Sequence, residues 1–205
     1  MAVPGNFSLK MHDASPGQWN MKSGIRVVPK HSGWWWEPST KLWATKWRSG
    51  RPVSRVSQLA AMEYAAWRSR SSDRWLFKLP DDGQWEKAAR GADRRIYVWG
   101  NYLIANFFWS YNAFSDPKSN KHVTGNVFST DESVYGIRDL AGSLREFTRS
   151  KALPRYNYVS LRGGNFRTTD EYESRIATRN GLPPDEADIR VGIRLIAIPK
   201  NNGPQ

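Results

Sequence analysis

The sequence predicts a single α+β domain with two main helices, short strands and much irregular chain. Residues 57–70 and 81–91 each combine helix-capping residues with apolar residues at helical spacing. Short apolar segments of the strand type lie around them, separated by turns rich in glycine and proline. The 205 residues are enough to enclose a sizeable core, so we expect one unit.

The first 50 residues are irregular, because glycine and proline recur too often for long elements. Ile25, Val27 and Val28 predict at most a short strand. Tryptophans are the notable feature of this segment: Trp34, Trp35, Trp36, Trp43 and Trp47. The rings either cover an edge of the core or form an exposed aromatic patch. The first interpretation is favoured because adjacent aromatic residues usually cover something.

The first predicted helix begins after Ser57, whose hydroxyl is a good N-cap. In the segment QLAAMEYAAWRSR that follows, Leu59, Met62, Ala66 and Trp67 recur at helical spacing. The pattern predicts an amphipathic helix with these four residues on its apolar face.

A strand and a second helix follow. Residues 75–77 predict a short strand that ends in a turn at residues 79–80. Asp81 or Asp82 is the expected N-cap of the helix, and Gly91 its C-cap. One face of this helix carries Trp85, Ala88 and Ala89.

Residues 101–134 predict a long loop, and a loop of that length inside a compact domain is usually functional or held in place. Aromatic residues are expected to anchor it: Phe107, Phe108, Trp109, Tyr111 and Phe114.

The segment from Ser160 to Ile196 has the features of a binding loop held at both ends. Gly163 and Gly164 permit positive φ or a close approach of another backbone. Residues 183–184 are prolines, which stop a helix, and the alternation over residues 189–195 predicts a half-buried strand. Permanently charged, planar groups are supplied by Arg162, Arg167, Arg175, Arg179, Arg190 and Arg194.

Composition excludes several kinds of site. The sequence has no cysteine, which excludes disulfides, thiolate nucleophiles and thiolate metal sites. It has no G-x-S-x-G motif for acyl transfer. His12, His31 and His122 lie far apart in the sequence, so we expect no histidine metal site. Paired carboxylates are more simply caps or solvated turns, although a hydrolase that uses two of them stays an alternative.

The formal net charge of +12 is unusual. Binding of nucleic acid through phosphate contacts and aromatic stacking is one interpretation. However, no Lys/Arg run exceeds two residues, which favours a basic soluble surface or an acidic protein partner. The sequence has neither a long apolar run nor a leader of the secretory type. We therefore predict no membrane span and a cytoplasmic or phage-particle location.

Four motifs occur in order between residues 51 and 196. They are RPVSRVSQLAAMEYAAW, LPDDGQWEKAARG, YGIRDLAGSLREFT, and RGG followed by Arg179, Asn180, Pro183 and then GIR. Together they resemble the formylglycine-generating-enzyme (sulfatase-modifying factor) family, and linked motifs are a stronger signal than a single one. The resemblance implies a C-type-lectin-like core over residues 51–198, with short twisted antiparallel strands. Residues 1–50 are then a shortened N-terminal segment packed on the core, and residues 199–205 a tail.

The resemblance also implies what chemistry to expect. The founding activity of the family oxidises a sulfatase cysteine to formylglycine with copper held by two cysteines. The resemblance places those cysteines just after RGG, where this sequence has Thr168 and Glu173. A hydroxyl and a carboxylate cannot hold Cu(I), which prefers thiolates. We therefore predict no such activity, no catalytic residue and no certain cofactor.

Calcium is the one ion that the resemblance suggests. The positions that match calcium-binding residues of relatives are Asp139, Gly142, Leu144 and Glu146. Oxygen ligands on a tight turn suit Ca²⁺, which would be structural here. Alternatively, Asp139 and Glu146 pair with Arg138, Arg145 or the arginines of the final segment. Both alternatives stay open.

These observations predict a catalytically silent family member that presents residues 167–188 to a macromolecular partner, most simply a protein. The candidate ligand-binding residues are Arg167, Thr168, Tyr172, Arg175, Arg179, Asn180 and Asp188. The resemblance implies two settings, a variable protein of a diversity-generating retroelement or a domain attached to signalling proteins. The alternatives are a basic nucleic-acid-binding protein and an uncharacterised non-copper enzyme of the same fold.

Overall fold

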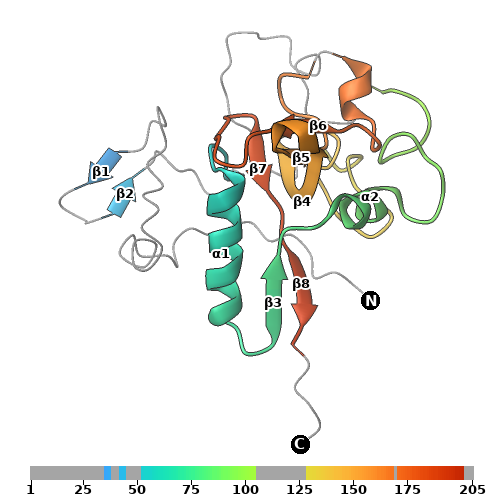
Figure 1. Cartoon of the computed structure of the whole chain (residues 1–205). Helices are drawn as coiled ribbons and strands as arrows, with labels where there is room; N and C mark the ends of the chain where they lie inside the picture. Colours follow the sequence, from blue (N-terminus) through green and yellow to red (C-terminus); the bar gives the residue numbers. More distant parts are fainter. Residues whose placement is uncertain (1–34, 38–41, 45–51, 105–127, 169, 201–205) are drawn as a thin grey trace, which may run out of the picture.

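A computed structural model describes residues 35–37, 42–44, 52–104, 128–168 and 170–200. Helices α1 and α2 and short strands alternate with irregular chain (Figure 1). The elements are β1 (Trp35–Glu37), β2 (Leu42–Ala44), α1 (Gln58–Arg70), β3 (Trp75–Lys78), α2 (Asp82–Arg90), β4 (Arg145–Leu153), β5 (Tyr158–Arg162), β6 (Asn180–Leu182), β7 (Val191–Ile193) and β8 (Ile196–Pro199), with short 3-10 helices η4 (Pro154–Tyr156) and η5 (Glu171–Ser174). The strand predicted near residue 25, Trp34, Trp47 and the aromatic residues of 107–114 lie outside the described residues.

Helix α1 begins at the predicted cap, where the Ser57 hydroxyl accepts the Ala60 N–H at 3.2 Å. Its predicted apolar face is wrong, because Leu59 and Met62 are 39% and 49% exposed. The buried residues are instead Gln58, Ala60, Ala61, Ala65 and Ser69. Hydrogen bonds explain the polar members: Gln58 Nε2 donates to the Thr148 carbonyl at 2.6 Å. Small residues and satisfied polar groups therefore let this helix lie close to β3 and β4.

Helix α2 follows its sequence signals. Asp81 is the N-cap, and its carboxylate accepts the Gln84 N–H while Gln84 Oε1 accepts the Asp81 N–H, which completes a capping box. Gly91 ends the helix with φ 79°. Trp85 and Ala89 are buried, so the predicted inner face is confirmed for these two residues.

The strands form small separate sheets. The largest has the order β6-β5-β4-β7, and β3 pairs with β8 in a second sheet. These pairs are antiparallel except for β4 with β7, which are parallel. The β1–β2 pair is antiparallel, with Trp36 opposite Trp43. The predicted α+β class is confirmed. The alternating segment near residue 190 forms two strands, β7 and β8, in different sheets, rather than one.

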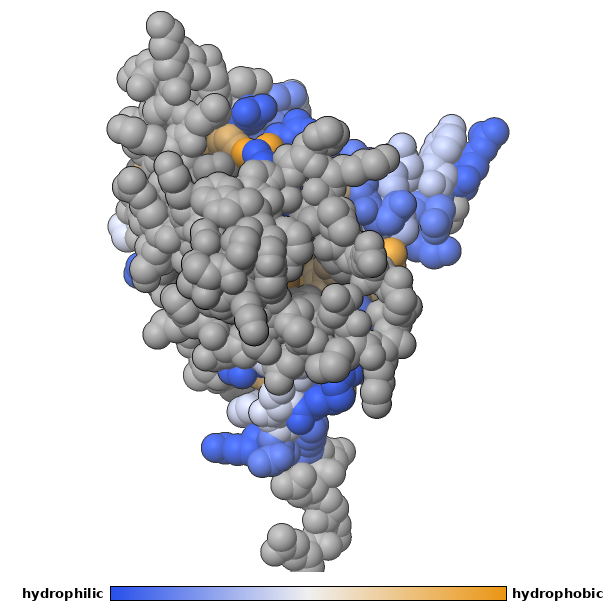
Figure 2. All heavy atoms as spheres, turned by 90° about the vertical axis from the view of Figure 1, so that its left-hand side faces the viewer, coloured by the Kyte–Doolittle hydropathy of each residue, from blue (hydrophilic) through white to orange (hydrophobic). Residues whose placement is uncertain are grey.

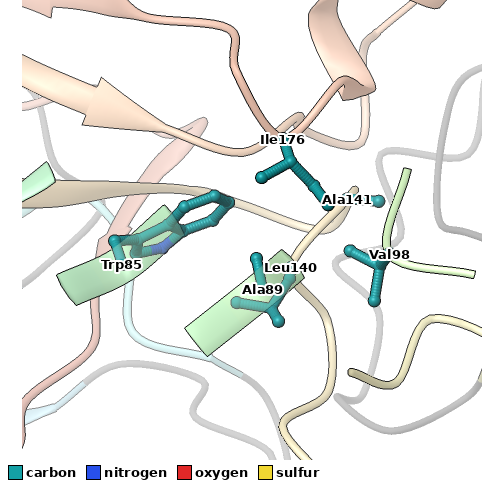
Figure 3. Packing of buried hydrophobic residues seen from close by; sticks show 6 residues of the cluster. All are labelled: Trp85, Ala89, Val98, Leu140, Ala141 and Ile176. Carbon is teal, nitrogen blue, oxygen red and sulfur yellow. The ribbon is translucent and has the colours of Figure 1, made fainter. Parts of the chain in front are cut away.

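Two clusters of buried apolar residues support the sheets. One lies around α1 and the inner face of β5, and contains Ala61, Leu79, Phe147, Val159, Leu161 and Val191. The other lies beside α2 and contains Trp85, Ala89, Val98, Leu140, Ala141 and Ile176 (Figure 3). Ile176 belongs to the segment between β5 and β6, so the predicted binding loop contributes to the core.

The two glycines of the RGG motif pack directly on other backbone. A Cβ on Gly163 would lie 2.6 Å from the Leu140 carbonyl oxygen, and a Cβ on Gly164 would lie 2.2 Å from that of Ala141. Gly163 also has φ 79°, which a residue with a side chain rarely adopts. These contacts hold the start of the final segment against residues 140–141.

We expect Gly164→Ala to lower the free energy of unfolding by at least about 2 kcal/mol, because the added methyl group overlaps a buried carbonyl. Urea denaturation followed by circular dichroism measures this. Gly83→Ala is the matched control, because Gly83 lies exposed in α2 and its Cβ would be 3.5 Å from the nearest side-chain atom. That change should be neutral or stabilising by about 0.5–1 kcal/mol. Equal unfolding midpoints for the Gly164 variant and wild type would contradict the packing argument.

Candidate binding site

Arg162, at the end of β5, joins the final segment to α2. Its side chain is fully buried and pairs with Glu86 at 2.7 Å. The same guanidinium donates to the Ile176 carbonyl at 2.9 Å and to the Ala177 carbonyl at 3.4 Å. It also lies 5.4 Å from the centroid of the Trp85 ring. Burial is the main cause that lowers the pKa of Arg162. Because an unpaired buried charge is costly, these contacts fix residues 176–177 in place.

The polar side chains on one face of β5 are spaced so that each meets a carboxylate of α2. Asp82 and Glu86 are one helical turn apart on α2, and Ser160 and Arg162 lie on the same side of β5. The Ser160 hydroxyl donates to Asp82 Oδ2 at 3.1 Å, just as Arg162 donates to Glu86. Thr148 of β4 donates to the other Asp82 oxygen at 2.8 Å. This buried polar network positions the strand from which the final segment leaves.

Thr168 and Glu173, which occupy the predicted cysteine positions, make contacts of their own. Thr168 is buried, and its hydroxyl oxygen accepts the Asn165 N–H at 3.0 Å. Glu173, in η5, forms an ion pair with Arg145 at the start of β4. The Arg145 side chain is only 9% exposed. Glu173 therefore binds the segment to the body of the domain, whereas Thr168 stabilises a local turn with Asn165.

Four of the predicted ligand-binding residues reach the surface. Tyr172 is 56% exposed, and the Arg175 guanidinium lies over its ring at 4.2 Å from the centroid. A hydrogen bond with the Tyr97 side chain is the main cause that raises the pKa of Arg175. Arg179 has a side chain that is 60% exposed and pairs with Asp82 at 3.2 Å. Arg167 is exposed and lies beside the Phe166 ring.

The other three predicted residues are less accessible. Thr168 is buried, as described, and Asn180 lies half-buried in β6, opposite Leu161 of β5. Asp188 is half-buried and pairs with Arg190 at 2.5 Å, and that hydrogen-bonded partner is the main cause that lowers the pKa of Asp188. The structure therefore separates the seven residues into an exposed set of four and a set that supports the backbone.

At the predicted calcium positions, Arg194 of the final segment contacts the carboxylate of Glu146. Arg194 approaches both oxygens of Glu146 at 2.7–3.0 Å, and Trp85 Nε1 donates to Glu146 Oε2 at 2.7 Å. Arg194 also donates to the Arg138 carbonyl at 2.8 Å. Glu146 therefore pairs with the final segment. A calcium ion at Glu146 would compete with Arg194, and calcium binding stays a prediction.

The turn before these residues is organised by Asp131. Its buried carboxyl group accepts the N–H groups of Leu140 and Ala141 at 3.0–3.2 Å. Burial raises the pKa of Asp131 to about 7. Asp139, further along the turn, has a left-handed backbone with φ 59°. Across the part of the chain that the structure describes, no three His, Asp or Glu side chains gather as a metal site would require.

On the face shown in Figure 2, the described residues that reach the surface are mainly hydrophilic. Among the described helices, neither α1 nor α2 combines the length and apolar character needed to cross a bilayer.

Comparison with known proteins identifies the family. Residues 10–198 match the Sulfatase-modifying factor enzyme 1-like domain. The chain belongs to this family. The sulfatase-modifying factor fold therefore accounts for almost the whole chain, and the resemblance predicted from the four motifs is confirmed.

Relatives of this sulfatase-modifying factor domain include proteins named as inactive. The Inactive C-alpha-formylglycine-generating enzyme 2 of Mus musculus is 32% identical over 184 residues, which cover 78% of this chain and 56% of that protein. The protein of the same name from Bos taurus is 29% identical, over 85% of this chain and 59% of that protein. The Formylglycine-generating enzyme of Mycobacterium tuberculosis is 26% identical, over 74% of this chain and 59% of that protein. The chain thus spans less than three fifths of each relative.

Solved structures show the same fold at low sequence identity. Treponema denticola variable protein 1 has a TM-score of 0.62 and 17% identity, over 86% of this chain and 79% of that chain. PvdO from Pseudomonas aeruginosa has a TM-score of 0.60 and 18% identity, over 74% of this chain and 63% of that chain. CarF has a TM-score of 0.60 and 16% identity, over 78% of this chain and 73% of that chain. The predicted C-type-lectin-like fold of the formylglycine-generating-enzyme type is confirmed.

The family includes copper enzymes, but the donors present here do not fit that metal. The sequence has no cysteine, Thr168 already accepts a backbone N–H, and Glu173 is paired with Arg145. These oxygen donors lack the soft character that Cu(I) requires.

Sequence reasoning grouped Arg162 and Arg194 with the charged groups of the binding loop, whereas the structure uses both inside the domain. Asp82 and Glu86 are spaced i, i+4, and Ser160 and Arg162 are spaced i, i+2. These matching spacings were a sequence signal for the pairing of Arg162 with Glu86. The Arg145–Glu173 pair had no local signal, because its members lie 28 residues apart.

We expect Glu146→Gln to destabilise the domain by about 3 kcal/mol or more, because it leaves the Arg194 guanidinium without its counter-charge. Chemical denaturation measures the loss. Asp93→Asn is the control, because Asp93 is 54% exposed and its pair with Arg95 lies at the surface. That change should cost much less, because the pair is exposed to solvent and screened by it. Similar small losses for both variants would show that the Glu146–Arg194 pair does not stabilise the fold.

Proposed function

We propose that this domain is a catalytically inactive binding module that recognises a protein partner through the segment from Arg167 to Asp188. The observation that carries the proposal is the contrast between the backbone and the side chains of this segment. Ile176 is 1% exposed and the Ile176 and Ala177 carbonyls accept from buried Arg162. Tyr172 and Arg179, in the same segment, point their side chains into solvent.

A fixed backbone with exposed arginine and tyrosine side chains is suited to recognition. Little ordering of the backbone is needed when a partner binds, because the segment is already held in one conformation. Arginine and tyrosine are also the residue types that contribute most at protein interfaces. The stacked pair of Tyr172 and Arg175 presents an aromatic and a planar cationic group together. We infer that this pair, with Arg167 and Arg179, determines which partner binds.

Two observations support an inactive rather than an enzymatic role. The cysteine positions hold Thr168 and Glu173, and both side chains have structural contacts. Two of the relatives are named as inactive formylglycine-generating enzymes. The likeness to a protein named variable protein 1 supports a role for the final segment in partner choice.

Selection of a random peptide library on the immobilised domain tests the recognition segment. We expect peptides selected on the wild type to bind Tyr172→Ala/Arg175→Ala at least about tenfold more weakly, since truncation of interface hot-spot residues weakens binding by about that factor or more. Interferometry measures the affinities. Tyr102→Ala is the control, because Tyr102 is 82% exposed outside the segment. If the selected peptides bind the double variant as well as the wild type, the segment is not the recognition surface.

The inactive assignment has its own test. Incubation with Cu(I), oxygen and a cysteine-containing sulfatase peptide should leave the peptide mass unchanged, because no thiolate is present to hold the metal. Mass spectrometry detects conversion of the cysteine to formylglycine. A copper-dependent conversion above that of a heat-denatured sample would overturn the assignment.

A further inference from the structure

The turn that joins β4 to β5 carries aromatic and basic residues at the surface. It consists of η4 and Asn157, whose backbone is left-handed with φ 55°. Tyr156 is 61% exposed. The Arg155 guanidinium lies 5.8 Å from the centroid of the Tyr156 ring, and the Tyr158 ring lies 6.1 Å from it at an angle of 52°. Three planar groups are therefore gathered at one turn.

The position of these rings is fixed by the neighbouring strand. A Cβ on Gly181 of β6 would lie 3.1 Å from the Ala152 Cβ and 3.2 Å from the Tyr158 Cδ2. A side chain at residue 181 would therefore press on the Tyr158 ring. Glycine at this position lets Tyr158 lie against β6, while Tyr156, next to it, stays open to solvent.

The charge around the turn is strongly positive. The sequence from Phe147 to residue 169 contains no Asp or Glu. Lys151 and Arg155 are exposed, and no carboxylate of the described residues forms an ion pair with either of them.

We propose that this turn, with Lys151, Arg155, Tyr156 and Tyr158, binds single-stranded nucleic acid. Exposed aromatic rings stack on unpaired bases of any sequence, and the adjacent cations contact the phosphates. An acidic peptide without aromatic residues would use the cations and leave the tyrosine ring unstacked. A duplex would offer no free base face to stack on. The proposal is independent of the partner of residues 167–188, because it uses a different turn.

Fluorescence anisotropy with a labelled single-stranded oligonucleotide tests the proposal. Tyr156→Ala should weaken binding roughly tenfold through the lost stacking. Lys151→Gln/Arg155→Gln should also weaken binding and should make the logarithm of the binding constant less dependent on salt, by about one unit of slope. The matched controls are Tyr102→Ala and Arg70→Gln/Lys87→Gln, which change exposed residues of the same types elsewhere. These control variants should bind as the wild type does.

Polyglutamate competition separates the two kinds of anionic partner. We expect the oligonucleotide to remain bound when polyglutamate of equal total charge is added as a competitor. The proposal is overturned if polyglutamate binds as tightly as the oligonucleotide and Tyr156→Ala weakens binding of neither. That result would mean that the turn is only a cationic patch. The proposal is also overturned if the cation controls lose as much affinity as Lys151→Gln/Arg155→Gln. Binding of peptides at residues 172–175 is measured separately and can fail or succeed without changing this result.

Discussion

The buried guanidinium of Arg162 is the interaction on which the binding segment depends. It satisfies the Ile176 and Ala177 carbonyls in the middle of a long irregular segment, and its charge is balanced by Glu86 of α2. Without such a donor, the buried Ile176 carbonyl would lie inside the domain with no strand partner. One side chain therefore replaces a length of regular secondary structure and holds the segment on a fixed path.

Two further arginines extend this arrangement. Arg145 holds η5 through Glu173, and Arg194 holds β4 through Glu146. Each pair joins a residue of the central motif to the final segment. In the copper enzymes of the family, sulfur atoms at the matching positions serve the metal. At the matching positions of this chain, Glu173 attaches the segment to β4 through Arg145, and Thr168 stabilises a turn with Asn165.

The sequence predicted the elements whose signals are local. Ser57 and the Asp81–Gln84 capping box marked the helix starts correctly, because a cap is decided by residues a few positions apart. The buried face of α1 was not predictable from hydrophobicity, since Gln58 is buried by a hydrogen bond to Thr148, a residue 90 positions away. Likewise, the linked motifs predicted the fold. They could not separate exposed Tyr172 from buried Thr168, because that distinction depends on contacts across the domain.

The pairing of β3 with β8 has a consequence for how the protein is made. Trp75 of β3 lies opposite Pro199 of β8, and Arg145 of β4 lies opposite Val191 of β7. Both earlier strands therefore pair with residues that are synthesised much later. Contacts of such long sequence separation slow folding. On the ribosome, β3 and one edge of β4 stay open until residues 191–199 emerge, and open edges recruit strands from other chains. Synthesis of residues 191–199 therefore covers the open edges of these two strands.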